Sequence, residues 1–165
     1  MDFVEFLGLV DGEFKDTPFP ELYKKIIGDK YVSPDSFIRK CFGNYAFDNR
    51  PALQVVANHL RAHPLAVKSL CHISVTDAAK AALSQHGETE ITLLDRLYAG
   101  DLGRVSDEEI VKIRLRIFYT MAQMPITDDS ITMKYYIRSN DGNGEEIMVK
   151  HYIYKKQSII YMPWE

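Results

Sequence analysis

The fold of this chain is decided by its residues 133–156, which read MKYYIRSNDGNGEEIMVKHYIYKK. Apolar and polar side chains alternate on both sides of the centre of this stretch, a period of two that is typical of strands with one buried face. The centre itself, residues 140–144, is rich in Asn and Gly, which supply the positive φ angles that tight turns need. The stretch therefore predicts an antiparallel β-hairpin that begins near Ile131 and reaches Ile153.

The hairpin is followed by a short connection, Lys155 to Gln157, after which residues 158–164 can return as a third antiparallel strand. Three strands need another element to pack on, so these strands are not expected to stand alone. The spacing of apolar residues changes near Pro125, from helical spacing to alternation. We therefore expect residues 126–165 to form a three-stranded antiparallel β-meander that packs on the rest of the chain.

Residues 1–125 predict an N-terminal helical body of six to eight helices. Three helix starts are marked by a capping side chain just before a proline, at Thr17-Pro18, Ser33-Pro34 and Asn49-Arg50-Pro51. Apolar residues then recur at helical spacing: Leu22, Ile26 and Ile27; Phe37, Ile38, Cys41 and Phe42; and Leu53, Val56, Ala57 and Leu60. Glycines mark the expected ends of the first two helices, at Gly28 and Gly43.

Further helices are expected over residues 64–72, from Ser74–Asp77 to Gly87, and over residues 90–98. The clearest helix follows, because Ser106-Asp-Glu-Glu109 is a capping box and residues 110–121 are apolar on most sides, as in the middle of a core. The predicted fold class is α+β. With 165 residues, 46% of them hydrophobic, the chain has the composition of a globular protein, and we expect one domain over residues 1–165.

Charge and cysteine content narrow the class of protein. Twenty basic and 23 acidic residues give a net charge of −3, which argues against a surface built throughout to hold nucleic acid. Cys41 and Cys71 stand far apart and are expected to be reduced and buried. Met1–Val10 carries acids and no basic region, and no uncharged stretch is long enough to span a membrane. We expect a cytoplasmic protein without membrane association.

Two patterns suggest a metal site, and neither is complete. His59 and His63 lie four residues apart and stack on one helix face, but Cys71 and His72 are neighbours that would point about 100° apart on a helix. In residues 139–150, Asp141 and Asn143 occupy positions of a calcium loop, yet Lys150 stands where a bidentate glutamate is required. We expect neither a metal nor a cofactor.

Catalytic and DNA-binding signatures are also incomplete. The sequence has no G-x-S-x-G, phosphate-loop or dinucleotide-binding motif. Cys41 follows two basic residues that could lower the pKa of its thiol, although burial as a small apolar side chain is the more common role. The helices of residues 90–98 and 106–123 followed by a hairpin resemble a winged helix-turn-helix in outline. However, the three basic residues of the second helix, Lys112, Arg114 and Arg116, alternate with apolar ones.

The hairpin face that points away from the helices is the main candidate surface. It is expected to expose the basic and aromatic residues Lys134, Tyr136, Arg138, Lys150, Tyr152, Tyr154 and Lys156. No acidic side chain is expected within the strands. Tyrosine and arginine are favoured at protein interfaces, whereas aromatic residues among cations also suit single-stranded nucleic acid. The same residues are equally good cross-strand neighbours on a face that binds nothing.

We therefore expect a non-enzymatic protein-interaction module, as an inhibitor or immunity-type protein would be. It is expected to bind another protein through the solvent face of its sheet, or through the third strand as an exposed edge. One alternative is single-stranded nucleic-acid binding by the same face. The other is an enzyme or metal protein that uses Cys41 or the His59/His63 pair.

Overall fold

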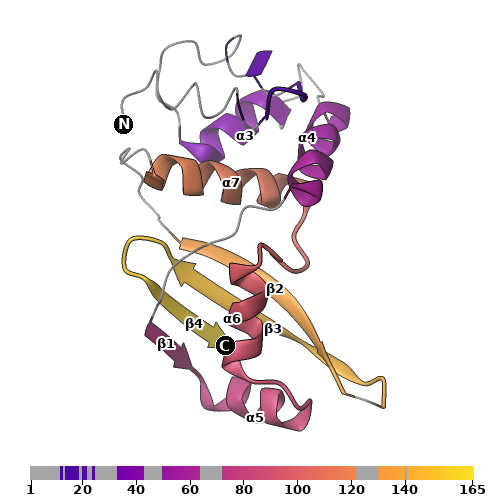
Figure 1. Cartoon of the computed structure of the whole chain (residues 1–165), viewed down its shortest axis with the longest axis vertical. Helices are drawn as coiled ribbons and strands as arrows, with labels where there is room; N and C mark the ends of the chain where they lie inside the picture. Colours follow the sequence, from indigo (N-terminus) through magenta and orange to yellow (C-terminus); the bar gives the residue numbers. More distant parts are fainter. Residues whose placement is uncertain are drawn as a thin grey trace. The chain divides into compact units, whose positions relative to one another are not determined.

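The computed structural model describes residues 33–42, 50–63, 72–121, 130–139 and 141–165, together with residues 12, 14–18, 20, 21 and 24. In chain order its elements are α3 (Pro34–Phe42), α4 (Arg50–Ala62), β1 (His72–Val75), α5 (Asp77–Gln85), α6 (Glu90–Tyr98), α7 (Asp107–Met121), β2 (Ser130–Arg138), β3 (Gly144–Tyr152) and β4 (Gln157–Tyr161) (Figure 1). Some predictions concern residues outside the described ranges: Met1–Val10, Leu22, Ile26, Ile27, Gly28, Gly43, Asn49, residues 64–71 with Cys71, and Pro125.

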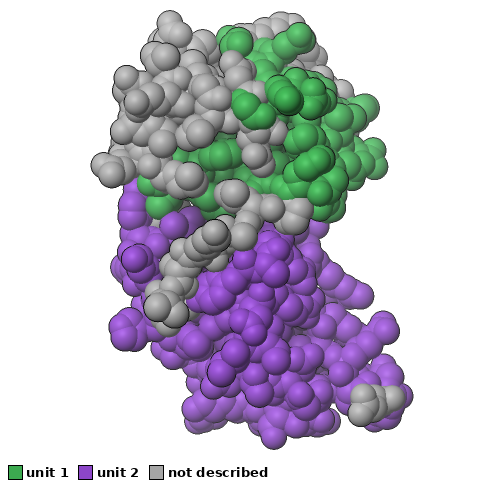
Figure 2. All heavy atoms as spheres, in the orientation of Figure 1, with its two compact units in different colours: residues 1–63, 106–128 green, residues 64–105, 129–165 purple. Residues whose placement is uncertain are grey.

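The chain divides into two compact units (Figure 2). Residues 1–63 and 106–128 form one, called the helical unit, and residues 64–105 and 129–165 form the other, called the sheet unit. Helices α5 and α6 thus belong with the strands. The expectation of a single domain, with a helical body over residues 1–125 and a meander over residues 126–165, stays a prediction.

In the helical unit, α7 is the central helix, as its sequence predicts. The capping box is formed: the backbone N–H of Glu109 donates to Ser106 Oγ at 3.2 Å, and the Glu109 carboxylate accepts from the Ser106 backbone at 3.1 Å. The side chains of α7 are buried on most sides of the helix, from Ile110 to Tyr119. They pack with the buried stripe of α4, which consists of Leu53, Val56, Ala57 and Leu60.

The sheet unit contains a mixed four-stranded sheet with the strand order β1-β4-β3-β2. The predicted hairpin is confirmed, because β2 and β3 pair antiparallel from Ser130↔Tyr152 to Arg138↔Gly144. Strand β4 continues antiparallel to β3, whereas β1 pairs with β4 in parallel, from His72↔Gln157 to Val75↔Ile160.

The predicted fold class is therefore wrong in two respects. The described residues form five helices instead of six to eight, and a four-stranded mixed sheet instead of a three-stranded antiparallel meander. The missing strand is β1, whose partner lies more than 80 residues further along the chain, so that no local turn signal announces the pairing. The helix that was expected to start at Ser74–Asp77 begins after an N-cap at Thr76, whose hydroxyl accepts from Ala79 N at 3.2 Å.

Helices α5 and α6 pack on one face of the sheet. The Tyr135 hydroxyl of β2 donates to the Asp101 carbonyl beyond α6 at 2.6 Å, and the Arg96 guanidinium lies 4.5 Å from the centre of the Tyr135 ring. At the end of α5, His86 Nε2 lies 3.2 Å from Glu145 Oε1 of β3. Between these polar contacts the core is apolar and includes Leu83, Leu93, Leu97, Met133, Val149 and Ile160.

The β2–β3 turn is stabilised by hydrogen bonds among its own polar groups. The Asp141 carboxylate accepts hydrogen bonds from the Ser139 hydroxyl and, at 3.0 Å, from the Asn143 backbone. These hydrogen bonds, first the one from Ser139, hold the pKa of Asp141 below its usual value. Gly142 supplies the positive φ of 86° that the turn requires.

None of the helices within the described ranges has the length and apolar character needed to cross a membrane.

Candidate protein-binding surface

Alternate residues of β2, β3 and β4 point away from α5 and α6 and form what is called here the outer face of the sheet. It consists of Thr132, Lys134, Tyr136, Arg138, Glu146, Met148, Lys150, Tyr152, Gln157, Ile159 and Tyr161, none of which is buried. Burial alternates strictly along β2 from Ile131 to Ile137, as expected for a sheet with one packed face.

Five of the seven residues predicted for the binding surface lie together on this outer face: Lys134, Tyr136, Arg138, Lys150 and Tyr152. The other two, Tyr154 and Lys156, do not continue the strand. They lie in the β3–β4 turn, residues 153–156, which connects Tyr152 to Gln157. Tyr154 is 52% exposed there. Lys155 of the same turn was not predicted as a site residue.

The expectation that the strands carry no acidic side chain is wrong. Glu145 and Glu146 both belong to β3, which begins at Gly144 and not at Ile147. Glu146 lies on the outer face opposite Tyr136 in the register, and its carboxylate oxygens lie 3.7 Å from Lys134 Nζ and 3.8 Å from an Arg104 nitrogen. At the end of the outer face near the β2–β3 turn, the Glu146 carboxylate therefore compensates the positive charge of Lys134 and Arg104.

Arg104 also contributes to the outer face, although the sequence does not predict it there. The segment around it runs along the free edge of β2, where Gly103 forms a bridge with Lys134 and the Arg104 backbone N–H donates to the Lys134 carbonyl at 2.6 Å. The Arg104 and Arg138 guanidinium carbons lie 4.9 and 5.4 Å from the centre of the Tyr136 ring. No local pattern reveals this contact, because Arg104 belongs to the connection between α6 and α7.

The opposite end of the outer face, next to the β3–β4 turn, has a different charge balance. Lys150 Nζ and Lys155 Nζ lie 5.2 and 5.3 Å from the centre of the Tyr152 ring. No described carboxylate forms an ion pair with Lys150, Lys155 or Lys156. These three lysines, with Tyr152 and Tyr154, are called the cationic end below.

Between the two ends lies a partly exposed apolar centre. Met148 pairs with Tyr161 across β3 and β4, and Ile159 pairs with Lys150. Ile159 and Tyr161 are not among the predicted site residues. The third strand is expected to be an exposed edge, but β4 lies between β1 and β3. A partner that covers this centre would gain hydrophobic free energy at about 25 cal/mol per Å² of buried apolar surface.

The histidine pair has no third His, Cys, Asp or Glu beside it for a metal ion in the part of the chain that the structure describes. The rings of His59 and His63 stack with their centres 4.7 Å apart, and His63 Nδ1 lies 3.1 Å from the His59 carbonyl. In the described ranges no group of three or more His, Cys, Asp or Glu residues could hold a metal ion. The side chain of Cys41 and the whole of Cys71 lie outside these ranges.

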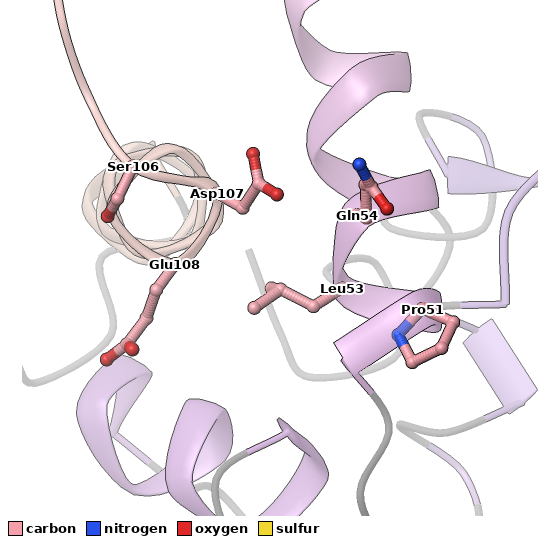
Figure 3. A pocket seen from close by; sticks show the side chains of 6 residues that line it. All are labelled: Pro51, Leu53, Gln54, Ser106, Asp107 and Glu108. Atoms are coloured by element: carbon pink, nitrogen blue, oxygen red, sulfur yellow. The ribbon is translucent and has the colours of Figure 1, made fainter.

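A hollow of about 500 Å³ lies between the start of α4 and the start of α7, in the helical unit (Figure 3). It is lined by Pro51, Leu53, Gln54, Ser106, Asp107 and Glu108. Its two carboxylates are both in ion pairs: Asp107 contacts Arg61 at 2.6 Å and Glu108 contacts Lys112 at 2.7 Å. Both acids are therefore engaged with basic residues of the helical unit.

The basic residues of α7 also form hydrogen bonds and ion pairs within the helical unit. Arg114 is buried and donates to the His63 carbonyl at the end of α4 at 2.5 Å, where a cation also suits the negative end of the helix dipole. Arg116 contacts Asp35 of α3 at 3.4 Å. Burial lowers the pKa of Lys112, but the carboxylates of Glu108 and Asp35 raise it by more, so that the pKa is above its usual value. All three basic residues of α7 therefore contact other groups of the helical unit.

Comparison with family models, with curated proteins and with solved structures gives no match for this chain.

Proposed function

We propose that this chain is a non-enzymatic protein-interaction module that binds another protein through the outer face of its sheet. The observation that carries the proposal is the composition of that face: partly exposed Tyr136, Met148 and Tyr152 alternate with basic side chains. Tyrosine, methionine and arginine are enriched at protein interfaces relative to the rest of the surface.

The tyrosines of this face are held in place before any partner arrives. Each of the Tyr136 and Tyr152 rings has two cationic groups within 5.4 Å of its centre, and cation–π contacts of this kind contribute about 0.5–1 kcal/mol each at exposed sites. A rigid sheet with ordered aromatic side chains loses little conformational entropy on binding. This arrangement favours recognition by preformed anchors.

Among the described residues, the contacts of two acids and of His86 support a role without catalysis. The acids that line the hollow of the helical unit are ion-paired, and His86 is engaged with Glu145 inside the sheet unit. An inhibitor or immunity-type protein, which neutralises its partner by binding it, needs only a surface of the kind that the outer face provides.

Affinity capture from the native cell extract, read by mass spectrometry, tests this proposal. The wild-type chain is compared with the Tyr136→Ala/Tyr152→Ala double variant and with Ile91→Ala, which changes an exposed apolar residue of α6. We expect the wild type and Ile91→Ala to recover the same protein, and the double variant to recover at least tenfold less. Recovery of no specific protein, or equal recovery by all three, would contradict the proposal.

Single-stranded nucleic acid is the competing ligand for the same face. Glu146 weighs against it, because a carboxylate between Lys134 and Arg104 repels phosphate. Titration with a labelled oligonucleotide at two salt concentrations distinguishes the two ligands. Binding that falls steeply with salt and is lost when Lys134 and Lys150 are reversed in charge would replace the protein-binding proposal.

A further inference from the structure

We infer that the cationic end of the outer face binds an acidic segment of the partner protein. This inference rests on the proposed function and adds the chemistry of the partner to it. The residues concerned are Lys150, Tyr152, Tyr154, Lys155 and Lys156, at the end of β3 and in the β3–β4 turn.

The first observation is the uneven charge balance along the face. Near the β2–β3 turn, Glu146 compensates Lys134 and Arg104, whereas no carboxylate within the described ranges pairs with any of the three lysines of the cationic end. Lys150 and Lys155 both place their ammonium groups within 5.3 Å of the centre of the Tyr152 ring. Carboxylates from a partner would relieve the repulsion between these like charges.

The second observation is the backbone of Lys156. Its φ angle is 48°, and it is the one described residue other than glycine with a positive φ. Most residues with a Cβ atom are strained in this conformation, which glycine adopts freely. The Lys156 carbonyl accepts a hydrogen bond from His72 N at 2.8 Å, but any residue can provide that backbone group. The fold itself therefore has no need of a lysine at this position, where the residue is exposed and adds to the charge of the cationic end.

The third observation separates an acidic protein segment from nucleic acid. Lys150 Nζ and Lys155 Nζ both lie over the Tyr152 ring, 5.2 and 5.3 Å from its centre. Bases stack on aromatic rings whose faces are accessible. Carboxylate groups need no access to the ring, because they pair with the ammonium groups themselves.

The test uses the full chain and a fluorescent peptide of eight glutamates, with an eight-residue glutamine peptide and an eight-nucleotide oligo-dT as comparison probes. We expect the wild type to bind the glutamate peptide at low salt and to release it as salt is raised. The Lys150→Gln/Lys155→Gln double variant should bind at least tenfold more weakly. The matched control Lys80→Gln, which removes an exposed lysine of α5, should bind as the wild type does.

A second variant, Lys156→Gly, separates binding from folding. Because glycine relieves the positive φ, we expect the midpoint of thermal unfolding to rise by about 2 °C, while the glutamate peptide binds at least threefold more weakly. A lower midpoint, or unchanged peptide affinity, would overturn the inference.

The outcomes also separate this inference from the proposed function. The inference is overturned if the glutamate peptide does not bind, if the glutamine peptide binds equally well, or if oligo-dT binds more tightly. The proposed function survives these results as long as a protein partner is captured through Tyr136 and Tyr152.

Discussion

Substitution of Gly103 by alanine tests how the structure positions Arg104 beside the outer face. Gly103 has a φ angle of 70° and lies so close to the edge of β2 that a Cβ atom would collide with the Lys134 carbonyl and lie 2.9 Å from a carbon of the Tyr135 ring. The backbone must therefore move away from β2 in the Gly103→Ala variant. This movement would break the hydrogen bond from Arg104 N to the Lys134 carbonyl.

The expected destabilisation has three parts. A positive φ in a residue with a Cβ atom costs about 1 kcal/mol, the lost backbone hydrogen bond about 1 kcal/mol, and the steric conflict with β2 and Tyr135 about 1 kcal/mol or more. We expect the free energy of unfolding of the Gly103→Ala variant to fall by about 3 kcal/mol, which corresponds to roughly 6–12 °C in the unfolding midpoint.

The matched control is Gly87→Ala. Gly87 has nearly the same φ angle, 68°, but an added Cβ atom would meet nothing within 4 Å, so only the conformational cost of about 1 kcal/mol is expected. Urea denaturation of both variants followed by circular dichroism gives the difference. Hydrogen exchange should show faster exchange of the Arg104 amide in Gly103→Ala alone. Equal stability of the two variants, within 0.5 kcal/mol by urea titration, would refute the reasoning.

Two further predictions concern folding. Burial, and then the Asp101 charge, hold the pKa of Tyr135 well above its usual range, so this phenol stays neutral in the folded chain, while the unfolded chain ionises above about pH 10. The stability from this group is present below pH 10 and is lost as pH rises further. The free energy of unfolding of the Tyr135→Phe variant should be lower by about 1 kcal/mol at pH 7. Between pH 10 and 11 it should decline less steeply than that of the wild type. An equal decline in the two proteins, measured by urea titration at each pH, would exclude this explanation. Ser106→Ala removes the cap of α7 and should cost about 1 kcal/mol, whereas Ser106→Asp, which can still accept from Glu109 N, should cost less. Equal losses in urea denaturation would argue against the capping role.

The parts of the fold that the sequence predicts are those with a local signal. The hairpin follows from strict alternation around a glycine-rich turn, and α7 follows from the Ser106–Glu109 box and its apolar run. Strand β1 has only four residues, His72–Val75, and no alternation long enough to separate it from a helix. Its place in the sheet depends on β4, which no nearby residue indicates.

The candidate surface shows the same limit. Alternation places Lys134, Tyr136, Lys150 and Tyr152 on one face, as predicted. The charge of that face depends on where β3 begins. The turn residues up to Gly144 predict a start at Ile147, which excludes Glu146 from the strand, but β3 begins at Gly144. Tyr154 and Lys156 were expected to extend the hairpin, but the chain turns at residues 153–156 so that β4 can return beside β3.

Site-specific photo-crosslinking tests the central claim most directly. A benzoylphenylalanine in place of Met148 stands in the centre of the outer face, and the same residue in place of Ile91 stands on the exposed side of α6. In native cell extract, we expect the label at position 148 to crosslink to the protein that the wild-type chain captures, and the label at position 91 to give no crosslink to it. A crosslink from position 91 without one from position 148 would contradict binding through the outer face.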